Sequence, residues 1–480
     1  MMLDASLVTI IALCVLLAMI FMAQPIWLAL AASGAIGLLL LDGFNVANIA
    51  IGSNTFDAVA SYSLLIIPMF VLMGVLSGKA GLAEDLFAVS EKIVGKLPGG
   101  LGIATILASA GFSAVTGSSS ATVATVGRIA IGEMESRGYK INSAGALVAM
   151  GGTLGVLIPP SIIIVIFGSM TGTSIGALLI ACVVPAIVTV IAYSLATIVQ
   201  FKRGKLTEKK ITEKKNVSTK TLVTAAVGGS TPSSQALNIG TGTGEGLDQA
   251  PKGLSRKNIT GALFVLLIFA IVIGGVYGGL FTATESGAIA AVVALLVLII
   301  RLRKFGVRRV TTDIRDSLVD TGAMTSMIFA LLAGGAVFGF FLVRTGLPNE
   351  LVRSVTSWDL NSTWIIIISL VLLLILGCFL DSYTIMIIVV PLIWPILDDM
   401  GVNGIWYGLL VVKAIEIGLV TPPFGLNVFV AAGMHKKMTP EGIFKEIFPF
   451  VLVEFAVIAL LMIFPELITW LPDLASSDTL

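Results

Sequence analysis

Ten apolar runs follow one another along this chain, and each approaches or exceeds the roughly 20 residues with which a helix crosses a bilayer. They cover residues 7–23, 26–42, 61–77, 141–168, 176–200, 259–278, 281–300, 322–342, 404–434 and 448–471. Only 12% of residues are charged, which excludes a soluble enzyme, a nucleic-acid-binding protein and a disordered scaffold. We therefore expect an all-α polytopic membrane protein with about ten spanning helices. The first run is expected to be a retained helix and not a cleavable signal peptide, because residues 1–6 contain no Lys or Arg.

Charged and metal-binding residues offer little for catalysis. The net charge is +1, so no global field steers an ionic partner. Three cysteines, Cys14, Cys182 and Cys378, lie in apolar runs and His435 is the single histidine, so neither a disulfide framework nor a His/Cys metal site is expected. No phosphate-binding G-x-x-x-x-G-K-[ST] motif or nucleophile–base arrangement occurs, so we do not expect an enzyme, and no cofactor is expected apart from a coupling ion.

Two further apolar stretches, 101–132 and 364–397, are each interrupted near the middle by polar, Gly-containing residues. Each is expected to form either a re-entrant hairpin or two spans, and both alternatives return the chain to the side from which it came. With an external N-terminus, 26 of the 29 Lys and Arg residues fall in cytoplasmic segments, as the positive-inside rule requires. The expected topology is that of a protein of the cytoplasmic (inner) membrane with both termini on the outer side of that membrane.

Three segments lie outside the apolar runs. Residues 201–258 combine 11 Lys or Arg with four acids and with Gly- and Ser-rich stretches, which is typical of a flexible cytoplasmic linker near anionic lipid. Residues 82–96 and 347–355 place apolar side chains on one helical face, so we expect two short interfacial helices there.

An internal repeat relates the two halves of the chain. A shift of 263 positions aligns 145–160 with 408–423 at six identities in sixteen positions, and it also places Ser118 on Asp381. Since the topology makes the two copies run in opposite directions, an inverted repeat is predicted, as in secondary transporters. The predicted domains are a first repeat over 1–200, the linker over 201–258 and a second repeat over 259–480. The alternative is chance similarity between Leu- and Gly-rich helices.

Each predicted repeat contains a Pro-Pro pair, Pro159–Pro160 in the first and Pro422–Pro423 in the second. Proline has no N–H, so two carbonyls lose their helical partner before each pair: those of Gly155 and Val156, and those of Gly418 and Leu419. Inside a membrane such carbonyls need partners, and a hard cation is a suitable one.

Further oxygen atoms lie close to these breaks in the sequence. The candidate oxygen-bearing residues are Ser118, Ser119, Ser120, Thr122, Thr153, Ser161, Asp381, Ser382, Thr384, Thr421 and Asn427. A donor set with almost no nitrogen or sulfur favours Na⁺ over a transition metal. Helix N-termini at the breaks favour an anionic substrate, and we assign Ser161, Ser382, Thr384 and Asn427 to that substrate.

Local structural roles are the alternative for each of these residues. A single Ser or Thr in a membrane helix often bonds to its own helix. Ionisable residues within apolar runs are costly and often functional, and four occur here: Asp381, Glu285, Lys413 and Glu416. Lys413 and Glu416 lie three residues apart, so they either pair with each other or take an ion or proton role. Glu285 either has such a role or orients a helix junction.

The motifs together resemble the large membrane subunit of TRAP transporters, the tripartite ATP-independent periplasmic carriers of bacteria and archaea. The resemblance covers nearly the whole chain. The matching motifs are GSSSATVATVG at 117–127, GGTLGVLIPPS at 151–161, TATE at 282–285, LGCFLD at 376–381 and IGLVTPPFGLN at 417–427.

This resemblance implies an elevator transporter that couples uptake to a Na⁺ gradient. It implies two partners, a soluble periplasmic substrate-binding protein and a small four-helix membrane subunit, which we expect as a separate chain. By its motifs, one Na⁺ site would use the first hairpin tip with Gly152, Thr153 and Pro159. The other would use Gly377, Asp381, Thr421, Pro422 and Gly425.

The predicted function is Na⁺-coupled uptake of a small organic anion of the carboxylate class, such as a C4-dicarboxylate or sialic acid, delivered by the binding protein. One alternative is an elevator-type symporter of Na⁺ and divalent anions that needs no receptor. Another alternative is a channel.

Overall fold

The computed structural model describes residues 4–22, 24–207, 255–347, 350 and 361–477, and every element among them is helical. The helices of the first half are α1 Ala5–Phe21, α2 Ile26–Asp42, α3 Phe44–Ile49, η1 Ala50–Asn54, α4 Thr55–Val59, η2 Tyr62–Leu65, α5 Ile66–Lys79, α6 Leu82–Val94, α7 Gly100–Thr116, α8 Ser119–Ser136, α9 Ile141–Leu157, α10 Ile162–Thr171, α11 Ile175–Ala181 and α12 Val183–Lys202. Those of the second half are α13 Arg256–Phe269, η3 Ala270–Gly274, α14 Gly275–Tyr277, α15 Ala283–Leu302, η4 Arg303–Phe305, α16 Val307–Arg344, α18 Ser362–Gly377, α19 Ser382–Asp399, α20 Gly404–Gly418, α21 Leu426–Ala432, α22 Pro440–Ile463 and α23 Glu466–Ser477.

Seven of the described helical segments are long and apolar enough to span a membrane, and the α9–α10 pair, bent by 40°, is an eighth candidate. The prediction of a multi-pass, all-helical protein is confirmed. The predicted number of about ten differs, because α1 and α2 have 17 residues each and the run 404–434 is divided into the short helices α20 and α21.

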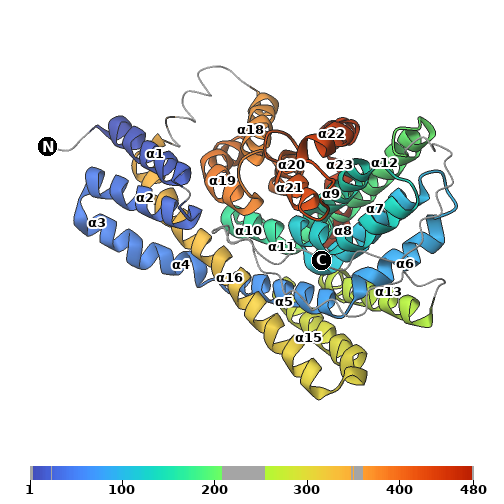
Figure 1. Ribbon diagram of the computed structural model, residues 1–480. Helices are drawn as coiled ribbons and strands as arrows, with labels where there is room; N and C mark the ends of the chain where they lie inside the picture. The colour runs from blue at the N-terminus through green and yellow to red at the C-terminus, as the bar shows by residue number, and fades with distance from the viewer. Residues whose placement is uncertain (1–3, 23, 208–254, 348–349, 351–360, 478–480) are drawn as a thin grey trace, which may run out of the picture.

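The longest helix, α16, crosses the molecule diagonally from beside α15 to beside α2 (Figure 1). Its 38 residues extend about 57 Å at 1.5 Å per residue, which exceeds the ~30 Å hydrocarbon thickness. The predicted span at 322–342 is therefore only the apolar part of a longer helix. Glycines let α16 approach α2 closely: a Cβ on Gly334 would lie 2.2 Å from the Trp27 carbonyl oxygen, and one on Gly34 would lie 2.7 Å from Phe338 Cα.

Residues 44–59 form a helical segment that the sequence analysis missed, namely α3, η1 and α4. Polar residues such as Asn45, Asn54 and Asp57 keep this segment from being recognised as an apolar run. Large apolar side chains nevertheless face outward along it, including Phe44 and Phe56.

The predicted interfacial helix at 82–96 corresponds to α6, which packs against α7. Asp85 on α6 is 2% exposed and pairs with Arg301 on α15, which also donates to the carbonyl of Ala80 at the end of α5. Burial raises the pKa of the Asp85 carboxyl, and the Arg301 guanidinium opposes that shift. Nearly all of the other predicted interfacial helix, 347–355, lies outside the described residues, as do residues 208–254 of the predicted linker.

The interrupted stretches and the Pro-Pro helices lie together in the middle of the molecule (Figure 1). The helices on either side of each interruption, α7 with α8 and α18 with α19, pack against each other. We call α7–α8 the first hairpin segment and α18–α19 the second. The first segment packs on α9 and the second on α20, while α21 reaches α8 and α10 reaches α19. We call α9–α10, interrupted by Pro159–Pro160, the first Pro-Pro helix and α20–α21, interrupted by Pro422–Pro423, the second. Each Pro-Pro helix therefore contacts both hairpin segments.

Candidate functional site

The first hairpin segment turns at Gly117, directly against the first Pro-Pro break. Gly117 has a left-handed φ of 59°, and a Cβ there would lie 2.5 Å from the carbonyl oxygen of Pro160. Only glycine satisfies both conditions. The chain then leaves Ser118 in extended conformation as the N-cap of α8, with Ser119 as the first helical residue.

Each hairpin segment touches its Pro-Pro helix through a glycine. A Cβ on Gly155 of α9 would lie 2.6 Å from the Ser118 carbonyl oxygen. A Cβ on Gly418 of α20 would lie 2.5 Å from Gly377 Cα, at the end of α18. Gly155 and Gly418 are 263 positions apart, the spacing that aligns the two halves of the sequence.

Ser119 connects the first tip to both Pro-Pro helices. Its hydroxyl lies 2.8 Å from the Gly152 carbonyl oxygen on α9 and also contacts the Glu416 carboxylate on α20. Glu416 is 3% exposed, and within the described chain no hydrogen-bond partner reaches its Oε1. The predicted proximity of Ser119 and Gly152 is thus present, with Glu416 added to it.

Thr153 faces a different set of partners from those predicted. Its hydroxyl lies 2.9 Å from the Tyr193 hydroxyl on α12, and Tyr193 donates to the Glu454 carboxylate on α22. Glu454 pairs with Lys413, whose ammonium group also donates to Thr189 at 3.2 Å. The alternative of a Lys413–Glu416 pair is wrong, because Lys413 reaches α22 instead.

Tyr193 and Glu454 were missed by the sequence analysis. A signal for Glu454 existed, since it is an acid inside the apolar run 448–471 and is therefore costly unless paired. No comparable signal pointed to Tyr193, because a tyrosine in an apolar helix is usually a packing residue.

Asp381 caps α19 in the second hairpin segment. Its carboxylate accepts the backbone N–H groups of Tyr383 and Thr384 at 3.1 and 3.2 Å, and it also accepts the Thr384 hydroxyl. Thr421, just after α20, donates at 2.6 Å to the Ile417 carbonyl at the end of that helix. Both residues therefore have the local roles that were the alternative, and their remaining lone pairs are still available to an ion.

The carbonyls before the second Pro-Pro pair are not free, contrary to the sequence prediction. The Gly418 carbonyl accepts the Thr421 N–H at 3.0 Å, and the Leu419 carbonyl accepts the Asn427 N–H at 3.1 Å. The first turn of α21 folds back against the end of α20 and supplies this second donor. Gly425, just before α21, donates its N–H to the Cys378 carbonyl at 3.4 Å, which ties the break to the second tip.

The residues assigned to the substrate are buried at helix starts. Ser161 caps α10 by accepting the Ile164 N–H, and Ser382 and Thr384 lie in the first turn of α19. Asn427 is fully buried on α21, and within the described chain neither Oδ1 nor Nδ2 of its side chain has a partner. A buried amide without partners costs free energy, so its polar atoms need partners that the described chain does not supply.

The two tips approach each other. The Tyr383 side chain, in the first turn of α19, lies near the Ser118 side chain at the first tip. Ser119 and Thr122 of the first tip are buried with Ser118, and Ser120 is partly exposed. The Pro159–Pro160 break is buried, whereas Pro422 and Pro423 are exposed.

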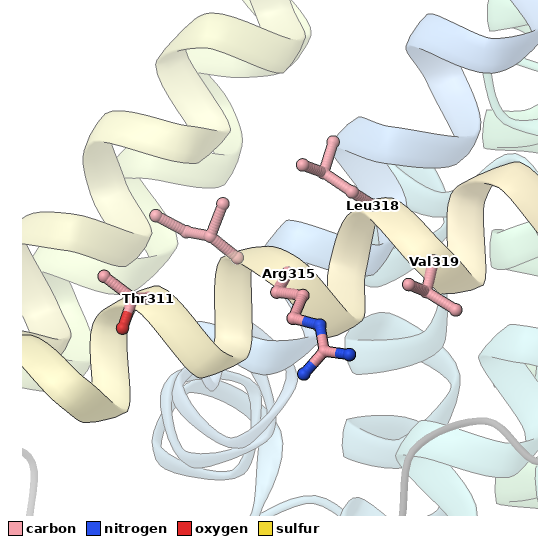
Figure 2. Close-up of a pocket in the computed structure, with 5 residues that line it drawn as sticks. Thr311, Arg315, Leu318 and Val319 are labelled. Carbon is pink, nitrogen blue, oxygen red and sulfur yellow. The ribbon is translucent and has the colours of Figure 1, made fainter.

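Two other features lie outside this centre. Glu285 forms a capping box with Thr282 at the start of α15, so of its two alternatives the structure favours helix orientation. A shallow hollow on α16 is lined by residues of that one helix, among them Thr311, Arg315 and Leu318 (Figure 2). It contains none of the residues at the breaks. The described residues also include no group of three His, Cys, Asp or Glu that could hold a metal ion.

Comparison with known proteins places this geometry in context. Residues 13–467 match the family model of the tripartite ATP-independent periplasmic transporter, DctM component. The chain is 33% identical to the C4-dicarboxylate TRAP transporter large permease protein DctM of Pseudomonas aeruginosa, covering 85% of each protein. It is 30% identical to the isethionate TRAP transporter permease protein DctMQ of Oleidesulfovibrio alaskensis, covering 92% of this chain and 61% of that protein. Its fold is similar to the crystal structure of the YdaH transporter of Alcanivorax borkumensis, with a TM-score of 0.60 over 91% of each chain at 13% identity.

Proposed function

The chain belongs to the DctM component family of tripartite ATP-independent periplasmic (TRAP) transporters, and from this membership we propose that it carries a small organic anion inward with Na⁺. As a large permease subunit it is a multi-pass protein of the inner membrane and not an enzyme. The proposed substrate is an organic anion because the relatives named above carry a C4-dicarboxylate and isethionate, a carboxylate and a sulfonate.

The observation that carries the proposal is the paired glycine packing at the centre. Gly155 packs against Ser118 and Gly418 packs against Gly377, so each joins a Pro-Pro helix to a hairpin tip, and Gly155 and Gly418 are themselves 263 positions apart. This supports two inverted repeats, over 1–200 and 259–480, with a shared site between them. The proposed mechanism is an elevator, in which the two hairpin segments and the two Pro-Pro helices move as a unit against a scaffold of the remaining helices.

The proposed ions lie at the two tips. The first Na⁺ site comprises Ser118, Ser119, Ser120, Thr122, Gly152, Thr153 and Pro159, and the second comprises Gly377, Asp381, Thr421, Pro422 and Gly425. Hydroxyl, carbonyl and carboxylate oxygens suit a hard monovalent cation. The contact of Ser119 with the Gly152 carbonyl supports the first site. The substrate is proposed to lie between the tips, against Ser161, Ser382, Thr384 and Asn427.

Two partners are proposed. A TRAP system includes a small membrane subunit and a periplasmic binding protein, and this chain spans 61% of the DctMQ relative, which leaves room for a second subunit in that protein. We propose that the small subunit of this system is a separate chain. Both termini are proposed to face the periplasm, with the linker in the cytoplasm.

The test is uptake by proteoliposomes that contain this chain and its small subunit, with purified binding protein loaded with a radiolabelled C4-dicarboxylate outside. An imposed inward Na⁺ gradient is expected to drive accumulation that stops when the binding protein is omitted. Accumulation without the binding protein would favour the receptor-independent symporter. Flux that ignores the Na⁺ gradient would favour a channel and contradict the proposal.

A further inference from the structure

Glu416 is a buried carboxylate for which the family site proposed above has no role. It lies on α20, three turns after the start of that helix, and is 3% exposed. Its Oε2 contacts the Ser119 hydroxyl at the tip of the first hairpin segment, so it links the second half of the chain to the first. Its Oε1 has no hydrogen-bond partner among the described residues.

With Glu416 ionised, the oxygens around Ser119 lack a hydrogen. Ser119 Oγ lies within hydrogen-bonding distance of both the Gly152 carbonyl and the Glu416 carboxylate, and both of these groups are acceptors. A hydroxyl has one hydrogen and can donate to only one of them. The other contact brings two oxygens together without a hydrogen between them. A cation in this cluster would remove the deficit, because it accepts lone pairs from all of these oxygens at once.

The buried charges around α20 do not cancel. Lys413 is the positive partner of Glu454, and its ammonium group also contacts Thr189. Glu416 is then left as a second carboxylate without a paired cationic side chain in the described structure. An isolated ionised carboxylate is costly in a low-dielectric interior, so either a proton or a cation must neutralise it, and the oxygen cluster around Ser119 favours the cation.

We propose that Glu416 is a ligand of the Na⁺ at the first tip, where it acts together with Ser119 Oγ and the Gly152 carbonyl. The site therefore draws on both halves of the chain, and the bound cation neutralises Glu416. Na⁺ binding at this position holds the first hairpin segment against the second Pro-Pro helix. This inference rests on the Na⁺ coupling proposed above and adds the charge-compensating ligand.

The test compares Na⁺ binding by the wild-type complex with that of Glu416→Gln, which keeps the size of the side chain and removes its charge. The chain is purified with its small subunit, and NaCl replaces choline chloride at constant ionic strength while the thermal unfolding midpoint is recorded. Na⁺-dependent uptake is measured in parallel. Glu285→Gln on α15 is the matched control, because it makes the same chemical change at a helix start outside the site.

For Glu416→Gln we expect the half-saturating Na⁺ concentration to rise at least tenfold and the Hill coefficient for uptake to fall by about one unit. Glu416→Asp, which keeps the charge on a shorter side chain, should recover part of the affinity, and Glu285→Gln should match wild type. If Glu416→Gln is not produced as folded protein, Glu416→Asp and Ser119→Ala test the proposal instead, since both should weaken Na⁺ binding.

Two outcomes overturn parts of this scheme separately. Wild-type Na⁺ dependence in Glu416→Gln, or in both Glu416→Asp and Ser119→Ala, would mean that Glu416 is held neutral by a proton and ligates nothing. That result leaves the proposed Na⁺ coupling intact. Absence of any Na⁺ effect in the wild-type protein would instead remove the proposed coupling, and the role of Glu416 with it.

Discussion

Lys413 on α20 forms its ion pair with Glu454 on α22, and not with Glu416 three residues further along its own helix. Both partners are at most 3% exposed. The pair joins the second Pro-Pro helix to α22, and Tyr193 extends the connection to α12 and to Thr153. The Pro-Pro helices are thus held together by a chain of buried polar side chains.

Removing Lys413 should destabilise the protein strongly. Lys413→Met leaves Glu454 buried without its cation, and the expected loss is about 3–5 kcal/mol of unfolding free energy. The double variant Lys413→Met with Glu454→Gln should recover most of this loss. The measurement is a double-mutant cycle by unfolding in mixed micelles. As a control, Lys79→Met breaks the partly exposed pair with Asp320 and should cost less than about 1 kcal/mol. Equal losses in both single variants would contradict a special role for the buried pair.

Adding a methyl group where the Pro-Pro helices meet the hairpin tips should stop transport. Gly155→Ala and Gly418→Ala place a Cβ within 2.6 Å of backbone atoms that cannot rotate away, so each tip must shift. The expected cost is about 1–3 kcal/mol of stability, together with loss of uptake in protein that still inserts. Gly132→Ala on α8 meets no atom within 4 Å and should transport normally. Full uptake by both close-contact variants would show that transport does not require close packing of the hairpin tips against the Pro-Pro helices.

Asp381 should have two separable effects. Asp381→Ala removes the N-cap of α19 and should cost about 1 kcal/mol, whatever its role in ion binding. Asp381→Asn keeps a capping oxygen but removes the charge. We expect Asp381→Asn to be as stable as wild type and to require several-fold more Na⁺ for half-maximal uptake. An unchanged Na⁺ curve for Asp381→Asn would leave Asp381 with its capping role alone.

Asn427 should tolerate an apolar replacement in folding but not in transport. Asn427→Leu has nearly the same shape and removes two buried polar atoms that lack partners. Its unfolding free energy is expected to equal or exceed that of wild type, by up to about 1 kcal/mol. Uptake should fall at least tenfold, through a higher half-saturating concentration of loaded binding protein. A strong loss of stability with uptake unimpaired would show that the amide has a structural partner instead.

Much of the fold follows from hydropathy, but helix ends do not. Apolar runs located most of the long helices, and the glycine- and serine-containing interruptions located the tips. The helical segment 44–59 was missed because its polar residues lower the local hydropathy, and α16 was shortened because its first turns carry charge. In both cases tertiary contacts stabilise helical structure that the local composition does not predict.

The candidate site was predicted in part. Ser119 and Gly152 were placed in one site by their motifs, and the structure brings them together. Thr153 belonged to the same predicted site, but its hydroxyl contacts Tyr193, which lies 40 residues later on α12. The Gly418 and Leu419 carbonyls were predicted to be free, but a turn bond from Thr421 satisfies the first and Asn427 of α21 satisfies the second. The second bond depends on how α21 folds back, which the local sequence does not reveal.

The order of residues alone determined that this chain is helical, crosses the membrane repeatedly and breaks twice at Pro-Pro, because a 20-residue apolar helix and a missing N–H are local properties. Only the tertiary structure decided which charges pair, which left Lys413 with Glu454 and Glu416 with Ser119. Ion pairing inside a membrane depends on which helices become neighbours, and side chains hundreds of residues apart compete for the same partner. The spacing of charged residues along one helix therefore does not predict which ion pair forms.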